Sequence, residues 1–322
     1  MADVKKLSAS KISTYTNCSM SYFLKYIEHR KVPTNVRFTF GKGIHYLLEE
    51  FYKKNFKSPE SFGGYWNFYW NMNVSGDNLK GKQKRELNVT EYPLKNGNAV
   101  RIGDHVDLGN HDPVGLFFGY MKLGNGILQE FYKRHIIEKR ENDLGRKPPV
   151  EIEKGFGVRK VEPFSINGHP IQGYIDRIDE KNGKHWIVDY KTDKKPPDTF
   201  VLHRNIPFSI YSYAFREIFN EKEEGLLNYH LRSGKPFKTH RSEKDYDYIK
   251  RVLDEVSDGI TKDKFIPMYG FKCKYCDYKV PCEDYSMEHH GGPKISLEGK
   301  IKTAETFDEW DDDLHGWEDT GQ

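Results

Sequence analysis

The sequence predicts an α/β fold, in which a sheet is flanked by helices. Asn167-Gly168 and Asn182-Gly183 are typical of two-residue hairpin turns, because both central residues of such a turn need a positive φ. These turns divide residues 151–191 into three antiparallel strands. Stretches in which apolar side chains recur every three or four residues lie on both sides of the strands and predict helices.

Two helices are expected near the N-terminus. Over residues 7–31, Tyr and Phe side chains recur at helical spacing, and Ser8 or Ser10 is a candidate N-cap. Residues 41–56 carry an apolar stripe at spacing i, i+3, i+4 and i+7, with His45 at its edge. Both segments are therefore expected to bury one face.

Helical spacing is interrupted and then returns along the rest of the chain. Residues 57–112 are polar, rich in Gly and Asn, and have no clean period, so they predict no element. Helices are expected at about 114–141, ended by Pro148-Pro149, and again at 207–219 and 243–260. The predicted parts are an N-terminal helical part at 1–56, an inserted, mostly helical region at 57–147, a core with a cysteine-rich end at 148–285, and an acidic, disordered tail at 286–322.

Charge is unevenly distributed along the 322 residues. The chain holds 51 Lys and Arg against 48 Asp and Glu, but eight of these acids lie in residues 303–322, which contain no Lys or Arg. Residues 1–302 therefore carry a net charge of about +11, which suits binding to a polyanion such as nucleic acid.

The acidic tail lacks the apolar content to fold. Trp310 and Trp317 among its carboxylates resemble a docking peptide for a protein partner or a mimic of DNA, whereas the simpler alternative is a solubilising tail. The N-terminus lacks the apolar stretch of a secretory signal, and no apolar run approaches the ~18 residues of a membrane span. We therefore expect a cytoplasmic protein whose thiols stay reduced.

Three charged side chains are expected to cluster at the end of an apolar strand. If Asn182 and Gly183 form the hairpin turn, Asp176 faces Asp189 directly, with Cβ atoms about 4.5–5.5 Å apart. Lys191 projects from the same face as Asp189, because side chains alternate along a strand. An apolar stretch leads into these charges, so they do not line a solvated face.

The repulsion between the two carboxylates requires compensation. A divalent cation such as Mg²⁺ or Mn²⁺ would supply it, since hard cations bind carboxylate oxygens and bridge to phosphate. Such an ion also acidifies water, while Lys191 would stabilise the charge of the transition state. The alternative is a simple ion pair, because the register of the first hairpin places Arg159 opposite Asp176. The apolar strand favours the metal site, and with it phosphodiester hydrolysis.

The stretch GYIDRIDEKNGKHWIVDYKT, residues 173–192, resembles the core of the PD-(D/E)XK nucleases, and their RecB-like branch in particular. The resemblance implies a restriction-endonuclease-like core with a mixed central sheet. It also implies that Asp176 and Asp189 bind the catalytic metal and that Lys191 is the catalytic lysine. Gly41-Lys42-Gly43-Ile44-His45 is similar to the Gly-x-x-x-His helix of the family and implies His45 as a further metal ligand. Taken alone, His45 would more simply be a hydrogen-bonded histidine.

Other positions match the family less closely. Ser209 and Tyr213 stand where the family usually has Gln-x-x-x-Tyr, so the Gln is missing, and Tyr213 either contacts DNA or packs in the core. Glu153 in VEIEKGF loosely matches a glutamate that some members carry on their first strand. Lys194 and Lys195 follow the Asp-x-Lys dyad and suit contacts with DNA phosphates, although adjacent lysines are also common in solvated loops.

All four cysteines fit one pattern. Cys273, Cys276 and Cys282 lie close in sequence, and Cys18 lies far upstream. Four thiolates from distant positions can hold Zn²⁺ or an iron–sulfur cluster, and spacing alone leaves both open. The arrangement is similar to the iron staple of RecB-like nucleases and implies a structural 4Fe-4S cluster, with Ser19 in place of the usual Pro. Such a clamp would close most of the chain into one unit.

Together these features predict a metal-dependent DNA nuclease, with exonuclease activity on single-stranded or duplex ends. Similar domains serve in DNA recombination, DNA repair and phage DNA processing. Two alternatives stay open: a non-catalytic nucleic-acid-binding or scaffold protein with a structural metal cluster, and a metal-dependent RNase. The intact set of Asp176, Asp189 and Lys191 favours catalysis over a scaffold role.

Overall fold

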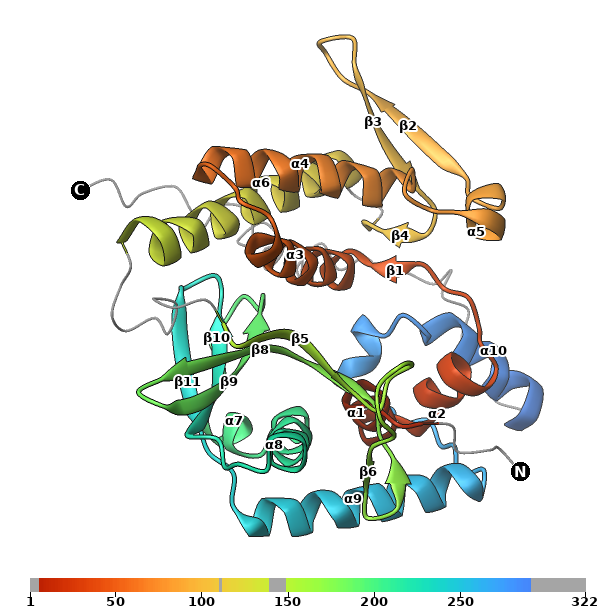
Figure 1. Ribbon diagram of the computed structural model, residues 1–322. Helices are drawn as coiled ribbons and strands as arrows, with labels where there is room; N and C mark the ends of the chain where they lie inside the picture. The colour runs from red at the N-terminus through yellow and green to blue at the C-terminus, as the bar shows by residue number, and fades with distance from the viewer. Residues whose placement is uncertain (1–5, 110–111, 139–148, 291–322) are drawn as a thin grey trace.

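The computed structural model describes residues 6–109, 112–138 and 149–290 (Figure 1). A five-stranded sheet lies between two layers of helices, so the predicted α/β fold with a mixed sheet is confirmed. The strand order is β11-β10-β9-β8-β5, with β9 and β10 parallel and the other neighbours antiparallel. The strands are β5 (Glu151–Phe156), β8 (Gly173–Lys181), β9 (Lys184–Lys191), β10 (Gly225–His230) and β11 (Lys235–Thr239).

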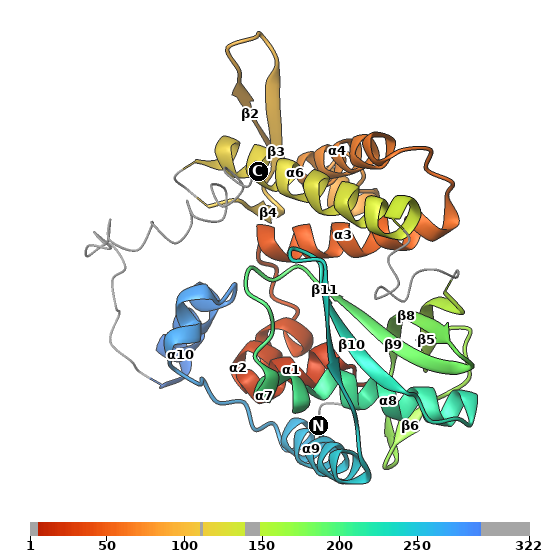
Figure 2. The same cartoon turned by 90° about the vertical axis from the view of Figure 1, so that its left-hand side faces the viewer.

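Neighbouring side chains of β9 enter different hydrophobic cores. Ile187 joins the core beneath the sheet, and Val188 joins the core above it. The strand is therefore buried on both faces, as its continuous apolar run predicts. Figures 1 and 2 show the two helical layers on either side of the sheet. The lower layer holds α1 (Ala9–Asn17), α8 (Ile206–Phe219) and α9 (Glu243–Thr261), and the upper layer holds α3 (Val36–Lys53), α4 (Pro59–Ser75) and α6 (Pro113–Tyr132).

The second Asn-Gly turn forms as predicted, with φ of 56° at Asn182 and 73° at Gly183. β8 and β9 pair in the predicted register, in which Arg177 lies opposite Val188. Asp176 and Asp189 are the next residues along the two strands beyond this pair. The hairpin therefore carries both carboxylates to one end of the sheet.

The first Asn-Gly turn also forms, but it closes only a small hairpin of β6 (Ser165–Ile166) and β7 (His169–Pro170). β5 pairs with β8 in a different register from the one that this turn sets. Arg159 lies in a turn beyond the end of β5, so the predicted alternative of an ion pair with Asp176 is wrong. The chain leaves the sheet at Gly157, where φ is 61° and an added Cβ would collide with the backbone.

The predicted helix over residues 7–31 is broken at Cys18, where φ is −164° and ψ is 108°. A short α2 (Ser19–Tyr22) and the π-helix η1 (Phe23–Ile27) follow. The break is stabilised by contacts with the C-terminal part of the chain, since the N–H of Met268 donates to Cys18 Sγ at 3.5 Å. Tertiary contacts therefore replace the turn of helix that local spacing predicts.

The other predicted helices form with shifted ends. Ser8 is the N-cap of α1, because its hydroxyl accepts the N–H of Lys11. α3 starts before the predicted residue 41, because Asn35 caps it. α6 and the π-helix η2 (Lys133–Glu138) cover the described part of the helix predicted at about 114–141. α8 and α9 begin within one residue of their predicted starts.

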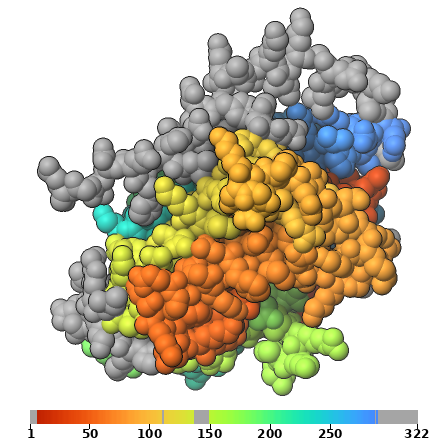
Figure 3. Space-filling model, turned by 90° about the horizontal axis from the view of Figure 1, so that it is seen from above, coloured from red at the N-terminus to blue at the C-terminus, as the bar shows by residue number. Residues whose placement is uncertain are grey.

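Residues 57–112, for which the sequence predicts no element, fold into most of the upper layer. Trp66 and Trp70 of α4 are fully buried against α6, and their ring N–H groups donate to carbonyls of Met121 and Phe117. Figure 3 shows this region, coloured orange to yellow, over the upper face of the molecule. Its other elements are α5 (Gly81–Arg85), the hairpin of β2 (Val89–Pro93) and β3 (Ala99–Gly103), and β4 (Val106–Asp107), which pairs with β1 (Thr34–Asn35).

The described chain ends in α10 (Lys279–His290), so the first residues of the predicted disordered tail are helical. The rest of that tail, with Trp310, Trp317 and the predicted contact with a protein partner, lies outside the described residues, as does Pro148. None of the described helices is long and apolar enough to cross a membrane. The remaining short elements are α7 (Thr199–His203) and the 3₁₀ turn η3 (Phe271–Tyr275).

Candidate functional site

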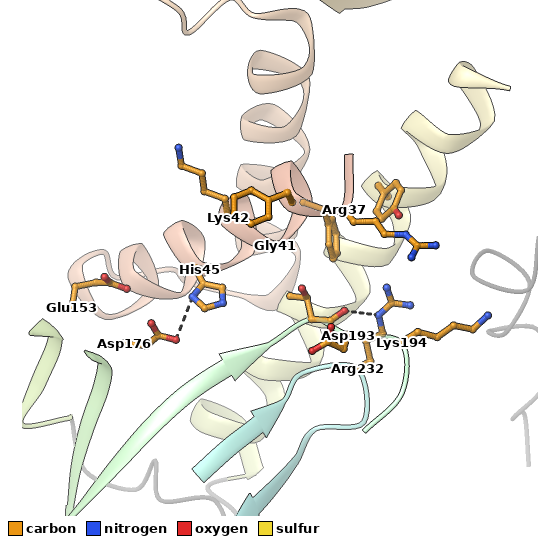
Figure 4. A pocket seen from close by; sticks show the side chains of 13 residues that line it. Arg37, Gly41, Lys42, His45, Glu153, Asp176, Asp193, Lys194 and Arg232 are labelled. Atoms are coloured by element: carbon orange, nitrogen blue, oxygen red, sulfur yellow. Dashed lines mark hydrogen bonds and ion pairs between the residues drawn. The ribbon is translucent and has the colours of Figure 1, made fainter. Parts of the chain in front are cut away.

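A cavity of about 580 Å³ lies where α3 faces the sheet near the end of β9 (Figure 4). Side chains from α3, β5, β8 and the segments after β9 and β10 line it, so the cavity exists only when distant parts of the chain are folded together. The helix approaches the loop after β9 closely, because a Cβ added at Gly41 would lie 3.2 Å from Thr192 Oγ1. The charged residues in its wall are Arg37, Lys42, Lys194, Arg232, Glu153, Asp176 and Asp193, together with His45.

The structure brings together the four site residues predicted from the hairpin and from α3. Asp176 Oδ2 lies 3.3 Å from His45 Nδ1 and accepts the backbone N–H of Tyr190 at 2.9 Å. Asp189 is 4% exposed, and its Oδ2 lies 2.5 Å from Lys191 Nζ. Each carboxylate therefore engages one cationic or protonatable group of the chain itself.

The pKa values at this cluster are strongly coupled to the enclosed charges. Burial alone would lower the pKa of His45, but Asp176 and Asp189 raise it to about 8. Burial opposes the charged form of Asp176, yet His45 and Lys191 hold the pKa of that carboxyl below its usual value. Burial raises the pKa of Asp189 in spite of Lys191. The cluster thus contains a carboxyl group whose charge its neighbours do not fully stabilise.

Glu153 adds a third carboxyl group to the cavity. Its φ is 50°, and it falls between paired residues of β5 without a partner of its own on β8. Burial, followed by the charges of Asp176 and Glu49, raises the pKa of Glu153 to about 7. The loose sequence match therefore corresponds to a residue of the cavity wall, and it increases the excess of carboxyl groups there.

Three basic residues of the wall were not predicted from the sequence. Arg37 and Lys42 lie on α3 with His45, and the spacing of Arg37, Gly41 and His45 is i, i+4 and i+8, which places them on one helical face. That spacing could have revealed Arg37. Arg232 follows β10, and its Nε donates to the Thr192 carbonyl at 2.9 Å. No local pattern could have revealed it, because its position depends on the parallel pairing of β10 with β9.

The remaining predicted contact residues divide between the cavity and other places. Lys194 lines the cavity, whereas Lys195 is an exposed residue that is not part of its wall. Tyr213 packs edge-on against Tyr246 in the core beneath the sheet. Ser209 accepts a hydrogen bond from Arg241 Nε at 2.9 Å. The core interpretation therefore suits Tyr213.

A buried polar network lies directly behind the site. Arg177 Nη1 donates to the hydroxyls of Tyr52 and Tyr190 at 2.8 Å each, and Nη2 donates to Asp179 Oδ2 at 2.6 Å. The Arg177 and Asp179 side chains are 1% and 3% exposed. The network joins α3, β8 and β9, and it fixes Tyr190, whose N–H holds Asp176.

The four cysteines come from both ends of the described chain and lie near one another. All four are free and half-buried, and Cys18, Cys276 and Cys282 pack against Met20 and other side chains of one small hydrophobic cluster. Burial and the neighbouring thiols, Cys18 first among them, raise the pKa of Cys282 to about 11. Across the described ranges, no group of three or more His, Cys, Asp or Glu is arranged closely enough to hold a metal ion.

Known proteins share parts of this sequence and fold. A model of the PD-(D/E)XK nuclease superfamily matches residues 6–283. The chain is 29% identical over 127 residues to Gene 69 protein of Mycobacterium phage D29, covering 37% of this chain and 45% of that protein. It is 26% identical over 200 residues to an ATP-dependent helicase/deoxyribonuclease protein of Carboxydothermus hydrogenoformans, covering 58% of this chain and 16% of that protein.

These matches span less than half of either relative's own length. The crystal structure of SSO0001 is also similar, with 14% sequence identity and a TM-score of 0.29 over 50% of this chain and 75% of that chain.

Proposed function

The chain belongs to the PD-(D/E)XK nuclease superfamily, and from this premise we propose that it is a metal-dependent nuclease that hydrolyses DNA. Membership implies a hydrolase of phosphodiester bonds. The observation that carries the proposal is the cluster of His45, Asp176, Asp189 and Lys191 at a cavity whose wall also holds basic side chains. A phosphodiester needs both kinds of group, because the basic side chains bind the phosphate and the cluster activates the attacking water.

In this proposal Asp176, Asp189 and His45 hold the metal ion. The donor set fits Mg²⁺ or Mn²⁺, because it offers carboxylate oxygens with one imidazole, and the two carboxylates follow each other across paired strands in a buried place. When bound, such an ion neutralises charge on the phosphate and acidifies water. The raised pKa of Asp189 supports the fit, since burial disfavours its charge and a divalent cation would stabilise it.

The chain's own groups supply the rest of the mechanism. Lys191 Nζ is held by Asp189 Oδ2 and donates a hydrogen bond to the attacking water or to a phosphate oxygen. The N–H of Tyr190 fixes Asp176 Oδ2 in orientation, so this carboxylate does not need to be ordered when substrate arrives. Arg37, Lys194 and Arg232 bind the phosphates on either side of the scissile bond.

DNA is the proposed substrate, with cleavage from an end of the strand. The relative from Carboxydothermus hydrogenoformans carries deoxyribonuclease in its name, which supports DNA over RNA. The cavity volume lies within the ~300–1,000 Å³ range of pockets that enclose small ligands, which supports entry of a strand end rather than an intact duplex. The intact charged cluster favours catalysis over a scaffold role.

We also propose that Cys18, Cys273, Cys276 and Cys282 bind a structural 4Fe-4S cluster, with Zn²⁺ as the alternative. Four thiolates suit either metal centre. Support comes from the packing of Cys18 beside Cys276 and Cys282 in one small hydrophobic cluster, although these lie more than 250 residues apart in sequence. A metal bound there would hold the break after α1 against the segment that precedes α10.

The test is a cleavage assay with full-length protein purified without oxygen, on labelled DNA and RNA of the same sequence, with Mg²⁺, Mn²⁺ or EDTA. Wild type is expected to cut DNA only with a divalent ion, and Asp189→Asn is expected to lose at least about 100-fold in rate. Asp258→Asn, a surface change on α9, is the matched control and should cut like wild type. Cutting of RNA alone would establish the RNase, and binding without any cutting would establish the scaffold alternative.

A further inference from the structure

One aromatic side chain in the wall of the cavity is exposed in a way that the core does not explain. Phe38 lies in the first turns of α3 and is 65% exposed, while Val36 and Phe40 on the same helix are buried. Phe38 lines the same cavity as His45 and Asp176. An exposed phenyl ring gains nothing from water, so its position at this cavity suggests a ligand with a flat apolar face.

The charges near the ring identify the ligand chemistry. Arg37, Lys42, Lys194 and Arg232 line the same cavity, and these side chains suit phosphate oxygens. A ligand that combines phosphate with a flat ring is a nucleotide. Lys25 Nζ lies 5.7 Å from the centroid of the Phe38 ring, which adds a further cation beside the aromatic ring.

From this arrangement we propose that Phe38 stacks on an unpaired base next to the scissile phosphate, and that the enzyme therefore prefers single-stranded ends to paired ones. The inference rests on the proposed nuclease function and names the substrate that this site selects. In a duplex, each base is stacked on its neighbours and shows only its edges in the grooves, so its face cannot reach a protein ring. An unpaired base has a free face, and aromatic side chains stack on it whatever its identity.

The matched control is another exposed phenylalanine outside the cavity. Phe68 on α4 is 62% exposed and does not line this cavity. Loss of either ring removes a similar exposed area, so both Phe38→Ala and Phe68→Ala should fold like wild type. Equal melting temperatures would verify this. Phe38→Trp keeps a flat aromatic face and serves as the rescue variant.

The experiment measures kcat and KM of the full chain with Mg²⁺ on a single-stranded oligonucleotide, on the same strand with abasic sites at its end, and on the blunt duplex. Anisotropy of the labelled single strand, in Ca²⁺, measures binding without relying on cleavage. Phe38→Ala is expected to raise KM and Kd for the single strand by about 5-fold to about 100-fold, with kcat nearly unchanged. Phe38→Trp should restore both values, and Phe68→Ala should not alter them.

Each outcome bears on a separate claim. The effect of Phe38→Ala should vanish on the abasic strand and be smaller on the duplex, since neither presents a free base. If wild type cuts the single strand and Phe38→Ala leaves KM and Kd unchanged, base stacking is refuted and the nuclease function stands. If wild type binds the single strand through Phe38 but never cuts, stacking stands and the nuclease function fails. Absence of both binding and cutting would overturn both.

Discussion

Replacing Arg177 by Met is expected to destabilise the protein while leaving most of the core volume filled. Arg177 makes three hydrogen bonds with Tyr52, Tyr190 and Asp179, all within 2.8 Å. Met removes these bonds but keeps a long apolar side chain, so the cost of a cavity is small. The main consequence is that Asp179, which is buried, loses its cation.

The expected loss is about 3–5 kcal/mol in the free energy of unfolding, the range for a buried ion pair deprived of one partner. The loss should also depend on pH. In the wild type, burial already raises the pKa of Asp179 against the lowering influence of Arg177, so in the variant that pKa rises further. A carboxyl group with a raised folded-state pKa destabilises the protein as pH rises towards that value. The deficit should therefore be smaller at pH 5.5 than at pH 8.

Urea unfolding followed by circular dichroism at the two pH values measures these quantities. Asp179→Leu and the double variant Arg177→Met/Asp179→Leu complete the cycle. Because apolar side chains can replace a buried ion pair at little cost, the double variant should lose much less stability than the two single losses added together. Strict additivity, or a loss below about 1 kcal/mol for Arg177→Met, would refute the reasoning.

Three further predictions concern the rest of the fold. Gly124→Ala should cost about 1–3 kcal/mol by overpacking, because its Cβ would lie 2.3 Å from Trp66, whereas Gly126→Ala on the same helix meets no atom within 4 Å and should cost nothing in the same thermal melts. Burial lowers the pKa of His135 to about 3, below its unfolded value of ~6.5, so His135 stabilises the fold above that value; the stability falls as pH drops from ~6.5 towards 3, and His135→Phe should flatten this part of the pH profile of unfolding. Cys282→Ser should lower both the melting temperature and the metal content per chain, measured by elemental analysis; unchanged values for both would exclude the metal centre.

Local turn chemistry accounts for the part of the site that could be predicted. Asn182-Gly183 fixes the register of β8 against β9, and that register alone brings Asp176 and Asp189 together. The same reasoning failed for Arg159, because it assumed that the first hairpin continues without interruption into the sheet. The chain instead leaves the sheet at Gly157, and no local pattern reveals such a departure.

The upper layer was hidden by its own aromatic content. Phe62, Trp66, Trp70 and Val74 repeat every four residues and are fully buried, which is a helical stripe. Exposed or half-buried aromatic residues between them, such as Phe68, obscured this period. Patterns of hydrophobicity fail where a helix is aromatic on several faces.

Long-range pairing determines the rest of the site. Arg232 reaches the cavity only because β10 lies parallel to β9, with His230 opposite Lys191. The break at Cys18 likewise depends on contacts with residues near Met268. Neither partner lies near in sequence, so local propensity could not reveal them.

The most direct test of the central claim compares wild type with Lys191→Met in cleavage of labelled single-stranded DNA as Mg²⁺ is raised from zero. The claim predicts no cleavage in EDTA and saturable, Mg²⁺-dependent cleavage by wild type. It also predicts that a folded Lys191→Met protein still binds Mn²⁺ and DNA but cuts at least about 100-fold more slowly. Cleavage that persists in EDTA, or a wild-type rate in Lys191→Met, would contradict the account.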